Sequence, residues 1–383
     1  MKVQAAVLRE AGLPTPYAES RPLTIESIDL APPQPGEVLV RILAAGLCHS
    51  DLSVIDGSRP RPLPMVLGHE AAGEIVEVGG RIRATNDGSA ALKPGDRVVF
   101  SFVPVCGHCG PCASGRPALC EPGAAANARG ELLRGGSRLR DCQGRAVHHQ
   151  LGVSGFAEYV VASTRSVVKV DAEVAPEVAA LFGCAVMTGV GAIVNTARVA
   201  SGEGVAVFGL GGVGLSAVMG ARAAGAYPLI AVDVNQDKLA LALTLGAHHS
   251  IDARRADAIE ALRDLTHGGV DYAIESVGNE RVLAQAYAAT RRGGTTISLG
   301  LPAPARMFSV PAVSLVAEER TVKGSYMGSA VPSRDLPRFI AMYRAGLLPV
   351  DKLLTHRLRL DEINSGFDRL ARGEAIRQVI LFA

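Results

Sequence analysis

The chain has 383 residues, enough for two domains with separate cores. Its formal net charge of +2 gives no electrostatic reason to expect nucleic acid or an anionic membrane as a partner. We identify no apolar run of the ~20 residues that a transmembrane helix needs and no secretory signal at the N-terminus. We therefore expect a cytoplasmic protein whose cysteines stay reduced.

The first part of the chain, to about residue 120, is expected to consist of short strands and turns. Strands are predicted over 38–42, 74–78 and 97–100, and a polar surface loop over 79–91. The segment 121–149 has no clear period, so its sequence leaves open whether it is an ordered excursion or partly mobile.

From about residue 186, strands alternate with helices, which predicts a parallel, doubly wound sheet. The predicted strands are 205–208, 229–233, 272–275 and 295–299, and the predicted helices are 215–224 and 238–245. Near residue 327 the alternation stops. The tail is predicted to hold helices over 335–344 and 361–372 and a closing strand over 377–382.

Seven cysteines occur in the chain, and four of them lie close together in sequence as Cys106, Cys109, Cys112 and Cys120. Four thiolates at this spacing can enclose one Zn²⁺ tetrahedrally, as structural sites do. The alternative, a disulfide framework, is disfavoured by the two-residue spacing and by a reducing compartment. A second metal-like context contains Cys48, His69 and Cys184, and a site with three such ligands keeps a position open for chemistry.

A nucleotide motif follows the strand 205–208 directly. Residues 209–214 match G-x-G-x-x-G at the start of a helix, the context in which this motif binds a dinucleotide. Gly209 permits the tight turn, Gly211 lets the backbone approach the pyrophosphate, and Gly214 allows close helix–strand packing. Asp233, about twenty residues on, can accept from the ribose hydroxyls and would repel a 2′-phosphate, which favours NAD over NADP. The alternative for Asp233 is a helix N-cap.

Taken together, these motifs resemble the zinc-dependent medium-chain alcohol dehydrogenases, closest to the longer-chain branch with the liver-type and glutathione-dependent formaldehyde enzymes. The segments that carry the resemblance are 48–51, 66–70, the four-cysteine lobe, 182–184, 206–218 and 374–377. It implies an α/β fold with a mostly-β GroES-like catalytic domain over 1–185, including a structural zinc lobe at about 104–122. A Rossmann coenzyme domain over 186–326 and a C-terminal segment, 327–383, that returns to the catalytic domain complete the implied architecture.

The resemblance also implies roles by position, with two zinc ions per chain and NAD as cofactors. Cys48, His69 and Cys184 would bind the catalytic zinc, with Asp51 orienting His69 and Glu70 close to the metal. Ser50 would hydrogen-bond the substrate hydroxyl, and Thr188 and Val213 would press the nicotinamide toward it. The implied cofactor contacts are His49, Arg377 and Lys238, together with Gly209, Gly211, Gly212, Gly214 and Asp233.

One departure from the family concerns the proton path. The position at which the family usually has a titrating histidine is Ser53 here. A serine does not titrate near neutrality, so we expect the pH dependence of alcohol oxidation to lack a histidine-like step.

The implied substrate is a primary alcohol or aldehyde. Alignment by position puts five side chains in the pocket wall, namely Phe102, Ala125, Leu151, Leu301 and Tyr326. The small Ser50 leaves room beside the metal, which favours medium-chain or aromatic alcohols. S-(hydroxymethyl)glutathione is an alternative substrate, although residues 121–126 lack the anion-binding arginine of that group.

An alternative hypothesis is a binding protein without catalysis, in which the cysteine lobe is a zinc ribbon. This hypothesis predicts a basic or aromatic surface, which residues 107–111 do not offer. Cys142 has no assigned role. The apolar segment 307–316 resembles the family's pairing edge, so a homodimer or a homotetramer is expected.

Overall fold

The computed structural model describes residues 1–80, 91–254 and 258–382. The chain divides into two units. The first comprises Met1–Cys184, Val331–Pro337 and Leu354–Ala383, and the second comprises Ala185–Ala330 and Arg338–Leu353. The division lies close to the predicted boundaries after residues 185 and 326, but residues 338–353 group with the second unit rather than the first.

The first unit is built mainly from strands. A closed barrel has the order β1-β2-β7-β8-β4, with bounds Lys2–Leu8, Leu23–Leu30, Leu139–Arg140, Ala146–His149 and Met65–Val66. A second sheet has the order β10-β6-β5-β3-β18-β17, with bounds Val167–Lys169, Arg97–Phe100, Glu70–Val78, Glu37–Leu47, Arg377–Leu381 and Leu354–Leu358, and β9 (Tyr159–Ser163) pairs with β3. The unit's helices are α1 (Tyr17–Ser20), α2 (His49–Ile55), α3 (Gly110–Ala113), α4 (Glu121–Arg129), α5 (Pro176–Leu181) and α13 (Ile363–Ala371).

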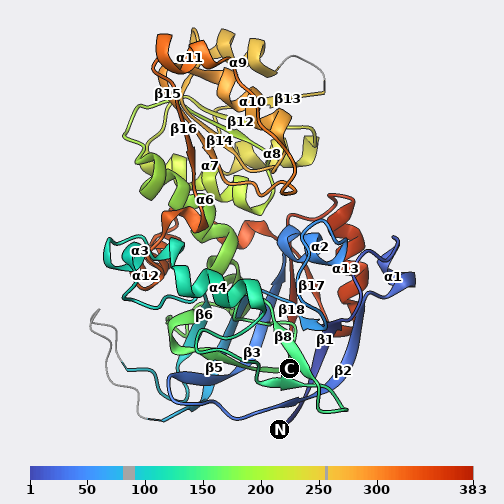
Figure 1. The fold of residues 1–383 in the computed structure, drawn as a ribbon. Coiled ribbons are helices and arrows are strands. Elements are labelled where there is room, and N and C mark those ends of the chain that lie inside the picture. The colour runs from blue at the N-terminus through green and yellow to red at the C-terminus, as the bar shows by residue number, and fades with distance from the viewer. Residues whose placement is uncertain (81–90, 255–257, 383) are drawn as a thin grey trace. The chain divides into compact units, whose positions relative to one another are not determined.

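The second unit contains the predicted doubly wound sheet (Figure 1). Its six strands are parallel in the order β13-β12-β11-β14-β15-β16, with bounds His249–Asp252, Leu229–Asp233, Val205–Phe208, Val270–Glu275, Thr290–Ser298 and Thr321–Gly324. Its helices are α6 (Met187–Gly191), α7 (Gly212–Ala224), α8 (Gln236–Thr244), α9 (Ala258–Thr266), α10 (Glu280–Ala289) and α11 (Ala312–Ala317). Helix α12 (Pro332–Arg344) begins in the first unit and ends in the second.

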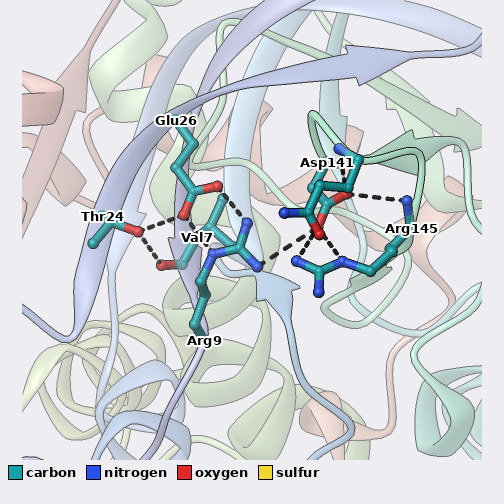
Figure 2. A network of polar contacts seen from close by, with 7 residues as sticks. Val7, Arg9, Thr24, Glu26, Asp141 and Arg145 are labelled. Carbon is teal, nitrogen blue, oxygen red and sulfur yellow. Dashed lines mark hydrogen bonds and ion pairs between the residues drawn. The ribbon is translucent and has the colours of Figure 1, made fainter.

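A network of polar contacts connects strands of the barrel at the turn between β7 and β8 (Figure 2). Arg9, just after β1, donates two hydrogen bonds to Glu26 on β2 and lies 3.7 Å from the Asp141 carboxylate. Arg145 donates to the same Asp141 carboxylate from the far side of the turn, at 2.9 Å. Asp141 therefore joins the β1–β2 pair to the β7–β8 hairpin.

The structure settles one expectation and corrects another. The segment 121–149 is ordered, with α4, β7 and β8 within it. In contrast, we expected no apolar run of membrane-spanning length. The helical stretch Pro176–Ala197 is nevertheless long and apolar enough to cross a membrane, with 89% of its most apolar window buried. A helix covered on all sides can be as apolar as a membrane span. Most of the loop predicted over 79–91 lies outside the described residues.

Candidate catalytic and nucleotide-binding sites

Residues from three distant parts of the sequence meet in the first unit. Cys48 caps α2 directly after β3, His69 and Glu70 lie at the start of β5, and Cys184 follows α5. The ligand atoms of these four residues all lie within 4.8 Å of one another, and all four residues are buried. Two thiols, an imidazole and a carboxylate in this arrangement fit a zinc ion in chemistry and in separation.

Asp51 fixes the orientation of the imidazole in this cluster. One carboxylate oxygen lies 2.8 Å from Nδ1 of His69, and the other accepts the backbone N–H of Cys48 at 3.0 Å. A carboxylate on one ring nitrogen sets the tautomer of a histidine and directs the other nitrogen to the metal. The role predicted for Asp51 as the group that orients His69 therefore matches its contacts.

The charges in the cluster favour a thiolate. A hydrogen bond with Cys184 lowers the pKa of Cys48 well below its ordinary value, against the effect of burial, and the Arg377 and His69 cations lower it further. Burial lowers the pKa of His69, but Asp51 and Cys48 outweigh it and raise that pKa well above its ordinary value. Zinc binds cysteine as the thiolate, so the lowered pKa of Cys48 agrees with a metal site. The hydrogen bond with Cys48 and burial raise the pKa of Cys184 well above its ordinary value, so a bound metal would have to displace protons from Cys184 and His69.

Glu70 and Arg377 form a buried ion pair beside the cluster, with 3.5 Å between the guanidinium and the carboxylate. Neither carboxylate oxygen of Glu70 makes a hydrogen bond within the described residues, and burial raises the pKa of Glu70 to about 8. Gly46 makes room for this carboxylate, since a Cβ there would lie 2.7 Å from its Oε2. Arg377, expected at the cofactor phosphates, is 3% exposed and contacts Glu70 and the Leu47 carbonyl.

The four-cysteine lobe is a second candidate metal site. The sulfur atoms of Cys106, Cys109, Cys112 and Cys120 all lie within 4.8 Å of one another. Backbone N–H groups of residues 108 and 109 donate to Cys106, and those of residues 106 and 123 donate to Cys120, at 3.2–3.5 Å. Burial raises the pKa of Cys120 although its two N–H donors act to lower it, so these donors fix the position of the sulfur atom rather than ionise it before a metal binds.

The glycine motif of the second unit has the expected local geometry. Gly209 has φ +87° at the end of β11, and a Cβ on Gly214 would lie 1.8 Å from the Gly209 carbonyl oxygen. A Cβ on Gly211, the N-cap of α7, would have open space around it. The space beside Gly211 at the N-terminus of α7 is thus open to an anion, as a pyrophosphate site requires.

Asp233 lies beside the glycine motif, at the end of β12. Its carboxylate accepts the N–H of Leu210 at 2.6 Å and those of Val234 and Asn235 at 2.7 and 2.9 Å. The N-cap of α8 is Asn235, whose side chain accepts from Asp237 and Lys238, so the N-cap alternative for Asp233 is wrong.

Comparisons with known proteins agree with this geometry. Residues 34–172 match the model of the alcohol dehydrogenase GroES-like domain, and residues 212–345 match that of the zinc-binding dehydrogenases. The structure is similar over 100% of the chain to an alcohol dehydrogenase zinc-binding domain protein from Burkholderia ambifaria, covering 99% of that chain at 38% identity with a TM-score of 0.92. The chain belongs to the zinc-dependent medium-chain alcohol dehydrogenase family.

Two further members are informative. Benzyl alcohol dehydrogenase from Acinetobacter calcoaceticus is 32% identical, with 100% of both chains covered and a TM-score of 0.91. A putative zinc-binding dehydrogenase from Sinorhizobium meliloti, bound to NADP, is 25% identical, with 100% of both chains covered and a TM-score of 0.80. The family resemblance and the two-domain fold class predicted from the sequence are confirmed, and this dehydrogenase is an oxidoreductase that uses zinc and a nicotinamide cofactor.

The residues predicted to line the pocket of this dehydrogenase are divided between the two units. In the first unit, Phe102 is buried with its ring edge-on to His69 at 5.8 Å between centroids, and Ala125 is exposed on α4. Leu151, also in the first unit, is partly buried with φ 52°. In the second unit, Leu301 and Tyr326 are 47% and 37% exposed.

Sequence reasoning missed Asn127, which donates from α4 to the Phe102 carbonyl at 2.8 Å and so ties α4 to the residue that contacts His69. No sequence motif marked Asn127. The signal available was a lone polar residue on the face of α4 that is otherwise buried through Gly123 and Ala126.

Proposed function

We propose that this protein catalyses reversible hydride transfer between a primary alcohol, medium-chain or aromatic, and NAD, with a catalytic and a structural zinc in each chain. The observation that carries the proposal is the buried cluster of Cys48, His69 and Cys184, with its imidazole oriented by Asp51. The similarity to benzyl alcohol dehydrogenase supports the aromatic part of the substrate range.

When bound, zinc lowers the pKa of an alcohol hydroxyl and polarises a carbonyl, and the nicotinamide accepts or returns the hydride. The protein's own residues supply ligands, orientation and a dry setting. Cys48 and Cys184 would bind the metal as thiolates and supply negative charge there. Asp51 holds His69, and the buried Phe102 ring lies edge-on to the imidazole. Ser50, partly exposed at the first turn of α2, would hydrogen-bond the substrate hydroxyl.

NAD is proposed over NADP because of the charge at Asp233. The carboxylate is held in place by three backbone N–H donors at the end of β12. Oδ1 accepts two of these N–H groups and Oδ2 accepts only that of Leu210, so Oδ2 retains acceptor capacity for a ribose hydroxyl. A 2′-phosphate there would face a fixed negative charge. His49, exposed at the start of α2, and Lys238 on α8 are proposed as further cofactor contacts.

The proton path would end without a histidine. The Ser53 hydroxyl, at the position where the family usually has one, donates to the His49 carbonyl at 2.9 Å within α2. We therefore expect a pH profile of alcohol oxidation without a step near the usual histidine pKa of ~6.5. Ser53→His should add such a step, and an unchanged profile in that variant would count against this route.

A homodimer, or a homotetramer built from it, is proposed through the second unit. Met307, Val313 and Val316 are 81%, 72% and 82% exposed. They lie on or near α11, close in sequence to β16, the strand at one edge of the sheet. Burial of such side chains would stabilise a pair of subunits. We propose a cytoplasmic enzyme that acts on a small molecule rather than on nucleic acid or a membrane.

The deciding experiment is NADH and NADPH formation by the purified protein across ethanol, a medium-chain alcohol, benzyl alcohol, a secondary alcohol and S-(hydroxymethyl)glutathione. Preference for benzyl or medium-chain alcohol with NAD supports the proposal. Turnover mainly of the glutathione adduct would replace the substrate, and turnover mainly with NADP would replace the cofactor. No turnover of any of these by a zinc-loaded protein would reject the function.

A further inference from the structure

A left-handed turn in the second unit combines unfavourable backbone geometry with unusually close packing. Met327, Gly328 and Ser329 all have positive φ, at 53°, 65° and 49°. Residues other than glycine seldom adopt this region, and consecutive residues there are rarer still. Such a conformation persists only where the surroundings hold it, and it tends to occur at functional sites.

The helix α6 holds one side of this turn. A Cβ on Gly191 would lie 2.6 Å from the Gly328 carbonyl oxygen, and a Cβ on Gly328 would lie 2.3 Å from the carbonyl oxygen of Met187 and 2.9 Å from that of Thr188. Backbone therefore packs directly on backbone at this point. The turn rests on the helical segment that carries Thr188.

Thr196 holds the other side through its hydroxyl group. Its Oγ1 donates to Ser329 Oγ at 2.9 Å and lies 2.7 Å from Ser325 Oγ. A threonine hydroxyl has one hydrogen, so with that hydrogen on Ser329 it accepts from Ser325. Thr196 is 4% exposed and lies in a π-helical turn, Ala192–Ala197, a feature that recurs at functional sites.

Neighbouring contacts reinforce the same connection. Asn195 donates to the Gly328 carbonyl at 3.3 Å, and the Lys323 ammonium donates to the Thr196 carbonyl at 3.1 Å. Ser325 and Ser329, the two residues bonded to the Thr196 hydroxyl, flank Tyr326, a residue proposed for the substrate pocket. On the other side of α6, a Cβ on Gly189 would lie 2.2 Å from the Val213 carbonyl oxygen.

We infer that Thr196 is a positioning residue: its hydroxyl joins Ser325 to Ser329 and so fixes Tyr326 relative to Thr188 and Val213. This rests on the proposed function and on the roles that the family resemblance implies, with Thr188 and Val213 beside the nicotinamide and Tyr326 in the pocket wall. The three side chains come from separate segments, and α6 with the Thr196 hydroxyl is what holds those segments together.

The test compares Thr196→Val, which keeps the shape but removes the hydroxyl, with Thr196→Ser, which retains it. Thr244→Val is the matched control, since Thr244 is exposed and its hydroxyl, among the described residues, bonds the Leu241 carbonyl of its own helix. Steady-state rates would be measured for benzyl alcohol and ethanol with NAD. Hydrogen exchange of the peptide over residues 325–330 would be measured on the zinc-loaded protein without cofactor.

We expect Thr196→Val to exchange faster over 325–330 and to lose about tenfold in kcat/KM for benzyl alcohol, since small misplacements cost one to two orders of magnitude. The ratio of kcat/KM for benzyl alcohol to that for ethanol should change as well, which a general loss of folded protein would not produce. Thr196→Ser and Thr244→Val should stay within about twofold of the parent protein, well inside that effect.

Unchanged exchange in Thr196→Val, or an equal loss in Thr244→Val, would overturn the inference. Faster exchange with an unaltered ratio of kcat/KM for benzyl alcohol to that for ethanol would also overturn it, because Thr196 would then fix the turn without affecting the choice of substrate. If the parent protein oxidises neither alcohol, the proposed function fails instead, and the exchange comparison still tests whether Thr196 fixes the turn.

Discussion

The two candidate metal sites of the first unit differ in how the chain builds them. The catalytic cluster gathers Cys48, His69 and Cys184 from segments far apart in sequence and buries them beside a carboxylate. The cysteine lobe takes all four ligands from the single segment 106–120, partly exposed, with backbone N–H groups as the neighbours of two of its sulfurs. The catalytic cluster therefore depends on the folded unit, whereas the lobe is a local structure that a metal can close. Loss of metal should accordingly remove activity at the first site and stability at the second.

The largest expected effect is on activity at the catalytic cluster. Cys48→Ser should lower kcat/KM by about 10³-fold or more, because the metal's contribution of several kcal/mol to the barrier is lost. Zinc content should fall from two ions per chain to one while the thermal unfolding curve moves little. Rate, zinc by atomic emission and Tm would be measured together.

Cys142→Ser is the matched control, since this cysteine is exposed in the β7–β8 turn. It should leave all three measurements unchanged. Near-normal activity in Cys48→Ser with only one zinc bound would contradict the assignment of the two sites.

The cysteine lobe should show the opposite pattern. Cys109→Ala removes one of four ligands, so zinc should again fall to one per chain, but the main consequence should be a lower Tm, since a structural metal contributes its binding energy to folding. Activity measured below the new Tm should decline far less than in Cys48→Ser. Equal losses of activity in the two variants would remove the distinction between a local and a catalytic site.

A smaller effect is expected at the residue that orients the imidazole. Asp51→Asn keeps an acceptor for the Cys48 N–H but removes the negative charge beside His69. Loss of such a partner typically costs about 10- to 100-fold in metal affinity or activity. Zinc competition titration would measure the affinity, with Asp56→Asn, at the exposed end of α2, as the control. No change in affinity would mean that Asp51 serves only to cap the helix.

The local character of the lobe also explains what the sequence could predict. The four cysteines, the glycine motif and Asp233 are visible because their function depends on spacing along the chain, and most strands of the doubly wound sheet are visible because they are buried apolar runs. Strand β16 was missed because Thr321–Gly324 is short, exposed along its whole length and contains a lysine and a glycine.

The rest of the site depends on contacts that no local pattern contains. The buried pair of Glu70 and Arg377 and the ring of Phe102 against His69 join residues from different elements. The positive φ values of Met327 and Ser329 are set by packing on α6 and not by their own preferences. The resemblance supplied roles for Glu70 and Arg377, but only the structure shows that they pair.

The smallest expected effect is on the pH dependence of stability in the first unit, and it comes from a buried histidine rather than from a metal ligand. His149, fully buried on β8, accepts the Arg138 N–H at Nε2 and has Ser154 Oγ at 3.3 Å from Nδ1. A proton on Nε2 would face that N–H donor. Burial, followed by the nearby charges of Arg138 and His148, lowers the pKa of His149 from 6.5 to about 3.

Because the folded pKa is the lower one, the unfolded chain takes up the proton first as the pH falls. This group's contribution to stability is present above about pH 6.5 and is lost progressively down to about pH 3, with a slope of about one proton. His149→Gln, which can still accept at one end, should make the free energy of unfolding of metal-free protein less dependent on pH across that window. Urea unfolding at a series of pH values in the presence of a chelator measures the difference. Parallel pH profiles for the two proteins would show that the acid sensitivity comes from other groups.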